Sequence, residues 1–235
     1  RRAKSTIGSY RLYLSDFLTH LGSRGVVHTA DISESDILTF VSSHPSDKVN
    51  IVSALRVLFR FWKEERITDS RFDELFDTYK AHRKERIPSF FTPGEVMRIE
   101  DSISRTSGVG KRNYAMVLLA SRLGLRASDI AGLRFSDIDW DRNTITITMQ
   151  KTGKIIELPL LADVGNAIID YLRHGRRNSP LQNVFISERA PYVAATPEMV
   201  SNAIRAIVIR SGVDTSSRHH GPHSLRHSLA SAMLD

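Results

Sequence analysis

Residues 124–134 read GLRASDIAGLR and contain the most informative pattern in the chain. The apolar pattern of one helix ends at Gly124, and a second, short helix is predicted directly after it. Arg126 therefore falls at a helix junction, three residues before the carboxylate of Asp129. A guanidinium at such a junction can bind a phosphate through two parallel hydrogen bonds while its neighbours fix its orientation. A surface arginine beside a capping Ser128 fits the same letters, so this segment alone leaves both interpretations open.

A second informative segment, residues 219–227, reads HHGPHSLRH. His223, Arg226 and His227 fall at positions i, i+3 and i+4, so a helix would place them on one face. Histidines this dense also suit a metal site, but the segment lacks carboxylates or thiolates at ligand spacing, and its neighbouring arginines would repel a cation. We therefore expect no metal here, and an anionic oxygen such as that of a phosphate as the ligand.

A third segment is a predicted β-hairpin. Residues 143–149 and 154–158 alternate between polar and apolar side chains, and a Thr-Gly pair between them supplies the turn. Lys151 lies at the tip, where a lysine is usually a solvated turn residue. Together with the arginines and histidine of the other two segments, however, it would add a cation and a proton donor. Such a set is suited to phosphoryl transfer on a phosphodiester without a metal.

The rest of the sequence is mostly helical in periodicity, which predicts a mainly α fold with one small antiparallel β-hairpin, an α+β class. Four helices are expected in the first part of the chain, over residues 5–21, 33–41, 47–62 and 70–79. A later helix is expected to start at residue 93. Further helices are expected over residues 114–123, 127–133, 162–172, 197–210 and 222–234, with a short strand over residues 183–186. A charged, proline-broken segment predicts a division into domains at residues 1–83 and 92–235 joined by a linker at 84–91.

Composition narrows the classes of function. The 235 residues include 33 Lys and Arg against 26 Asp and Glu, a formal charge of +7, and no Cys. A basic chain favours a polyanionic partner such as nucleic acid, and the lack of cysteine excludes a thiolate nucleophile and any disulfide. No stretch is apolar enough to span a bilayer, so we expect no membrane partner and a cytoplasmic location.

Taken together and in this order, the three segments resemble the motifs of the tyrosine recombinase family, which includes phage integrases and Xer-like proteins. The resemblance covers about residues 92–235 and implies a catalytic domain there. The preceding helical segment resembles the family's core-binding domain, which clamps DNA, only in size and pattern.

The resemblance implies a role for each matching residue. Asp129 stands where glutamate is commoner in the family, which keeps the charge but shortens the reach. The implied catalytic residues are Arg126 and Arg226 as the two arginines, Lys151 as the hairpin lysine and His223 as the first histidine, with Asp129 and His227 in supporting positions.

The reaction implied by the resemblance is attack of a tyrosine hydroxyl on a DNA phosphodiester, giving a 3′-phosphotyrosyl link and a free 5′-hydroxyl. None of the six tyrosines in the sequence matches the context of that nucleophile, which the family places after this last motif. We therefore expect the nucleophile beyond Asp235, the catalytic domain to be truncated at its C-terminal end, and residues 1–235 to bind DNA without cleaving it.

The resemblance also implies the partners. They are double-stranded DNA and, on synapsed sites, further copies of the chain in a homotetramer associated with the nucleoid, with no cofactor and no small-molecule substrate. Two other functions remain open from the sequence. One is a type IB topoisomerase, which uses a similar set of residues, and the other is a DNA-binding module without catalytic activity.

Overall fold

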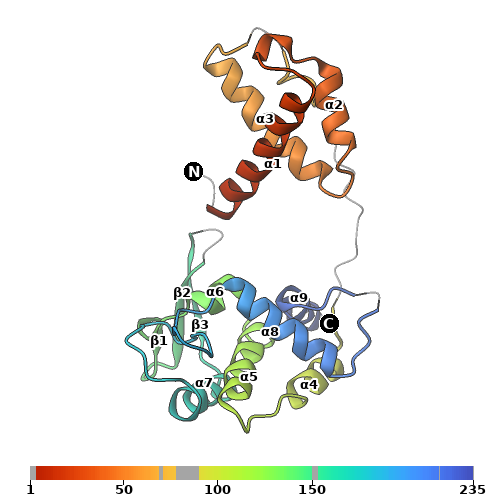
Figure 1. The fold of residues 1–235 in the computed structure, drawn as a ribbon. Coiled ribbons are helices and arrows are strands. Elements are labelled where there is room, and N and C mark those ends of the chain that lie inside the picture. The colour runs from red at the N-terminus through yellow and green to blue at the C-terminus, as the bar shows by residue number, and fades with distance from the viewer. Residues whose placement is uncertain (1–3, 69–70, 78–89, 150–152, 217, 235) are drawn as a thin grey trace. The chain divides into compact units, whose positions relative to one another are not determined.

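The computed structural model describes residues 4–68, 71–77, 90–149, 153–216 and 218–234. The chain divides into two compact units, Arg1–Glu85 and Arg86–Asp235, referred to below as the N-terminal and C-terminal units. Each unit has its own hydrophobic core. Figure 1 labels the helices and strands of both units.

Three helices form the described part of the N-terminal unit, α1 (Lys4–Ser23), α2 (Glu34–Ser42) and α3 (Lys48–Glu64), with a short 3-10 turn at Thr29–Asp31. The predicted start of α2 is confirmed, because Ser33 and Asp36 form a reciprocal capping box. The core is rich in aromatic rings, among them Phe17, which lies 5.2 Å from Phe40 between ring centroids. Aromatic side chains contribute a large apolar area per residue, which suits a unit this small.

The fourth helix predicted in this unit is wrong for the residues that the structure describes there. Residues 71–77 form turns closed by hydrogen bonds over three residues, such as that from Leu75 N to Phe72 O. The apolar spacing is still used, because the rings of Phe72 and Phe76 both pack against Phe59. Arg56 of α3 donates to the carbonyl of Phe76. That carbonyl is one that a continuing helix would have paired along its own backbone.

The C-terminal unit is built around α5 (Gly108–Ser121), whose side chains are buried over most of its length. Figure 1 shows it between the sheet and α7 on one side and α4 and α9 on the other, and α5 contacts all three helices and α8. The surrounding helices are α4 (Pro93–Asp101), α6 (Ala127–Gly132), α7 (Ala162–His174), α8 (Pro197–Arg210) and α9 (Pro222–Ala232).

Proline in the first turn marks three of these helices. It fixes the backbone angle that the helix needs and removes an amide that would lack a partner. Thr92 and Thr196 cap α4 and α8 by accepting a hydrogen bond from the amide of the third helical residue. The predicted helix starts at residues 93, 197 and 222 are confirmed. Among the described helices of both units, none combines the length and the apolar character that a membrane crossing needs.

The sheet is antiparallel and has the order β1-β2-β3, with strands β1 (Ile138–Asp139), β2 (Thr144–Thr148) and β3 (Ile155–Pro159). A 3-10 turn at Phe135–Asp137 leads into β1. The predicted hairpin is confirmed, and its register places Ile147 opposite Ile156. The strand expected over residues 183–186 is reduced to two isolated bridges, Arg134 to Asn183 and Ile186 to Ala194. The mainly α fold with a small antiparallel sheet is thus confirmed.

Candidate active site

The turn between α5 and α6 depends on one glycine. Gly124 has a φ of +60°, a left-handed conformation that side chains with a Cβ rarely adopt. A Cβ at this position would lie 3.2 Å from Leu229 Cδ2 and 3.6 Å from Arg226 Cγ, so α9 packs directly against the turn. The glycine thereby lets two segments separated by about a hundred residues of sequence meet at one place.

Arg126 follows this turn and is the N-cap residue of α6, with an extended backbone. Its Nη1 lies 3.9 Å from the Oδ2 of Asp129 and 3.3 Å from the Sδ of Met149. The Asp129 side chain is 1% exposed, whereas that of Arg126 is 31% exposed. A buried carboxylate behind a partly exposed guanidinium favours one orientation of the arginine and leaves part of it open to a ligand.

Arg226 approaches the same turn from α9. Its Nη1 donates a hydrogen bond to the carbonyl oxygen of Gly124. Burial lowers the pKa of Arg226 from its ordinary value, the positive charge of Arg126 lowers it further, and Asp129 opposes both effects. The two guanidinium groups are therefore close enough to repel each other, and an anion bound between them would relieve that repulsion.

The two histidines predicted to share a helix face do so. The Nε2 atoms of His223 and His227 lie 2.9 Å apart, within hydrogen-bond distance, so one ring donates and the other accepts. His223 is exposed and His227 is half-buried, which places the pair at the surface of the unit. Nowhere in the described ranges do three or more side chains of metal-ligand type come together in a group that could hold a metal ion.

The opposite face of α9 is fixed to the core. Leu225 is fully buried, and Ser228 Oγ accepts a hydrogen bond of 2.7 Å from the amide of Phe91 while donating to the carbonyl of Ser224. Because these contacts are buried, they fix the orientation of α9 on the core. Its remaining face then presents the histidines and Arg226 to the surface.

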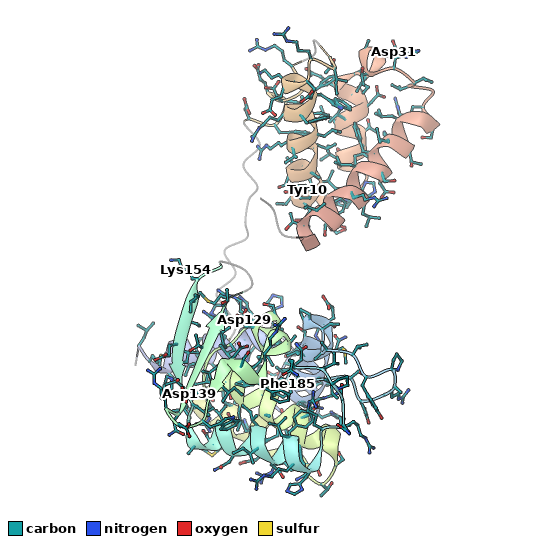
Figure 2. The ribbon with its side chains drawn as sticks, turned by 90° about the vertical axis from the view of Figure 1, so that its left-hand side faces the viewer. Tyr10, Asp31, Asp129, Asp139, Lys154 and Phe185 are labelled. Carbon is teal, nitrogen blue, oxygen red and sulfur yellow. The ribbon has the colours of Figure 1, made fainter. Side chains whose placement is uncertain are left out.

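Lys151 lies outside the described residues, but the structure describes the residues on either side of its turn. Met149 N donates to Lys154 O and Gly153 N donates to Met149 O, both at 2.8 Å. Figure 1 places the upper end of β2 at the same end of the C-terminal unit as α6 and α9. Figure 2 places Lys154 at that end of the hairpin and Asp129 below it, beside the strands. The described end of the hairpin, at Met149 and Lys154, and both arginines therefore belong to one end of this unit.

Met149 and Ser228 were not singled out by the sequence. Met149 contacts Arg126, and Ser228 holds α9, but neither belongs to a pattern of charged or nucleophilic residues. Both contacts join segments far apart along the chain. A single sequence without the fold contains no signal for them.

The tyrosines of the C-terminal unit have other surroundings. The guanidinium carbon of Arg105 lies over the ring of Tyr114, 4.8 Å from the ring centroid. Tyr171 is buried against Phe185, and this burial raises the pKa of its hydroxyl. Tyr192 lies in the loop where Ser187 and Val193 are hydrogen-bonded. The positions of Tyr114 and Tyr171 agree with packing roles, whereas Tyr192 is exposed.

The chain is similar to proteins that recombine DNA. Residues 89–235 match the model of the phage integrase family. The integrase/recombinase y4rA of Sinorhizobium fredii is 32% identical over 99% of this chain, which spans 57% of that protein. The tyrosine recombinases XerC of Anoxybacillus flavithermus and XerD of Mycobacterium leprae are 26% and 28% identical over 98% and 99% of this chain, which spans 78% and 79% of them.

Solved structures show the same fold. A lambda integrase (75–356) dimer bound to a COC′ core site matches with a TM-score of 0.72 and 17% identity, over 98% of this chain and 83% of that chain. The XerH recombinase in a post-cleavage complex with its difH substrate matches with a TM-score of 0.74 and 19% identity, over 97% and 68%. At this level of identity the match establishes the fold alone.

Proposed function

The chain belongs to the phage integrase family of tyrosine recombinases, and we propose that it acts on duplex DNA as a site-specific recombinase or integrase. The observation that carries the proposal is the pairing of Arg126 and Arg226 around the Gly124 turn. Two guanidinium groups held together against their repulsion form a site for a phosphate. Related structures with the same fold are described as complexes with DNA, which supports the same partner.

In the proposed reaction, a tyrosine hydroxyl attacks the scissile phosphorus and forms a 3′-phosphotyrosyl bond as the bond to the 5′ oxygen breaks. Arg126 and Arg226 stabilise the negative charge on the non-bridging oxygens. Lys151 gives a proton to the leaving 5′ oxygen, and His223 assists proton transfer at the nucleophile. Asp129 orients Arg126, and His227 holds His223 through the bond between their rings.

The phosphotyrosyl link conserves the energy of the phosphodiester bond, because one ester replaces another. Rejoining therefore needs no nucleotide cofactor. One of the solved relatives is described as a lambda integrase tetramer bound to a Holliday junction. We extend that assembly to this chain as part of the proposal, with four copies on synapsed DNA sites.

Salt dependence of DNA binding tests the arginine pair. Each phosphate that a protein neutralises contributes about −0.9 to the slope of log K against log salt. Arg126→Ala is expected to make that slope shallower by about one unit. The measurement is fluorescence anisotropy of a labelled duplex over a salt series.

Arg210→Ala is the matched control for that experiment. Arg210 ends α8 beside Gly110 in the first turn of α5, whereas Arg126 follows the other end of α5. Its loss is expected to leave the slope unchanged. Equal slopes for Arg126→Ala and the unmodified chain would place Arg126 away from the DNA and contradict the proposal.

We further expect residues 1–235 to bind duplex DNA without forming a covalent bond to it. Two tyrosines of the C-terminal unit are held in packed contacts, Tyr171 against Phe185 and Tyr114 under Arg105, and Tyr192 lies before the last motif of the sequence. A nicked suicide substrate and denaturing electrophoresis measure the covalent protein–DNA adduct. A recombinase of the family that contains its nucleophilic tyrosine serves as the positive control. An adduct formed by this chain would show that one of its own tyrosines is the nucleophile.

A further inference from the structure

Met149 connects two parts of the site. Its thioether lies 3.3 Å from Nη1 of Arg126. Its backbone amide and carbonyl are hydrogen-bonded to Lys154 and Gly153, next to the turn of the hairpin. Met149 is half-buried, so part of it is open to solvent. We propose that Met149 is an oxidation site at which a peroxide weakens phosphate binding by Arg126. This inference rests on the proposed function, since it assumes that Arg126 binds DNA phosphate.

The chemistry follows from the change in the acceptor. A thioether is a weak hydrogen-bond acceptor, so reduced Met149 leaves Arg126 available to a phosphate. When the sulfur attacks hydrogen peroxide, an S–O bond forms and the O–O bond breaks. The sulfur loses two electrons, and the second peroxide oxygen leaves as hydroxide, which takes up the proton of the transferred oxygen to form water. The product is a methionine sulfoxide.

A sulfoxide oxygen at this position changes what Arg126 contacts. It is a strong, polar acceptor attached to a sulfur that already lies against the guanidinium. A hydrogen bond from a charged donor to such an oxygen competes directly with a hydrogen bond to phosphate. Met149 belongs to the hairpin, next to its turn, so a hydrogen bond from Arg126 to the sulfoxide oxygen would also link the hairpin to Arg126.

The other four methionines differ in their surroundings. Met199 is half-buried in the first turn of α8. Met116 is buried in the core. Met97 and Met233 are exposed and should oxidise readily, but Met97 lines an apolar groove on α4 and Met233 follows α9. These two therefore provide an internal control, because their oxidation adds oxygen to the protein without placing it beside Arg126.

The test treats the chain with hydrogen peroxide and measures its dissociation constant for a labelled mixed-sequence duplex. We expect the affinity to fall about tenfold, the size of one charge-assisted hydrogen bond, in proportion to the Met149 sulfoxide found by peptide mass spectrometry. Met149→Leu should resist the treatment, and the double variant Met97→Leu with Met233→Leu should respond as the unmodified chain does. Methionine sulfoxide reductases should restore binding.

Several outcomes would overturn the inference. They are an unchanged affinity when Met149 is oxidised, an equal loss in Met149→Leu, or a Met149 that stays reduced while Met97 is fully converted. Circular dichroism separates a local effect from unfolding, and the correlation with sulfoxide occupancy needs no variant at all. Failure of the unoxidised chain to bind DNA, or an unchanged salt slope in Arg126→Ala, would instead contradict the proposed function.

Discussion

In a protein that supplies the nucleophilic tyrosine together with residues 1–235, Lys151→Ala is expected to slow cleavage of a normal phosphodiester by about 10²–10⁴-fold, the usual contribution of a general acid. The reason is that a 5′ alkoxide leaves poorly without a proton. A substrate with sulfur in place of the bridging 5′ oxygen releases a thiolate, which leaves without protonation. That substrate should restore most of the rate, measured as covalent adduct formed in single-turnover reactions.

Arg226→Ala is the contrasting variant. Its guanidinium is proposed to stabilise charge on the non-bridging oxygens, which the sulfur does not replace, so the sulfur substrate should give it no rescue. Lys154→Ala is the matched control on the same hairpin. Equal rescue of Lys151→Ala and Arg226→Ala, or rescue of Lys154→Ala alone, would assign the proton donor to a different residue.

Local signals in the sequence were sufficient for most elements of the fold. A serine, threonine or proline at a helix start acts within a few residues, so the starts of α2, α4 and α8 could be predicted. The alternation of β2 and β3 is likewise local, since every second side chain is buried in β2 and half-buried in β3. Strand β1 has two residues, too few for any alternation to appear.

The predicted fourth helix and the predicted strand over residues 183–186 differ from the structure for one physical reason. Contacts between residues distant in sequence outweigh the local pattern. The apolar spacing of residues 71–77 fits a helix. Turns nevertheless allow Phe72 to pack on Phe59 and the carbonyl of Phe76 to accept a hydrogen bond from Arg56. The buried run around Phe185 suggests a strand, but its partners in the described part of the chain are single residues on either side. Apolar periodicity does not distinguish these alternatives.

The candidate site was predictable in its chemistry and only partly in its geometry. The spacing of His223 and His227 on one helix implied their contact, which the structure describes at 2.9 Å. The approach of Arg226 to the Gly124 carbonyl depends on how α9 packs on the α5–α6 turn, and no local pattern encodes it. For the same reason the contact between Arg126 and Met149 appears only in the folded chain.

The contact between α9 and the α5–α6 turn depends on Gly124, so a substitution at Gly124 is expected to have a large effect. Gly124→Val is expected to lower the free energy of unfolding by about 3 kcal/mol, because a β-branched residue at a positive φ is strained and its side chain would overlap Leu229. Gly212→Val is the matched control, since Gly212 has a φ of +73° but no atom within 4 Å of the added Cβ. It should show the backbone strain alone, about 1–2 kcal/mol. Urea unfolding measures both.

DNA binding by the same two variants separates stability from site geometry. In Gly124→Val the turn must shift away from α9, which moves the carbonyl that Arg226 binds and separates the two guanidinium groups. We therefore expect its affinity for duplex DNA to fall about tenfold under conditions where it remains folded, as expected for the loss of one charge-assisted phosphate contact. Gly212→Val should bind as the unmodified chain does. If both variants lost affinity equally, the arginine pair would not depend on the turn, and the convergence of α6 and α9 at Gly124 would matter for folding only.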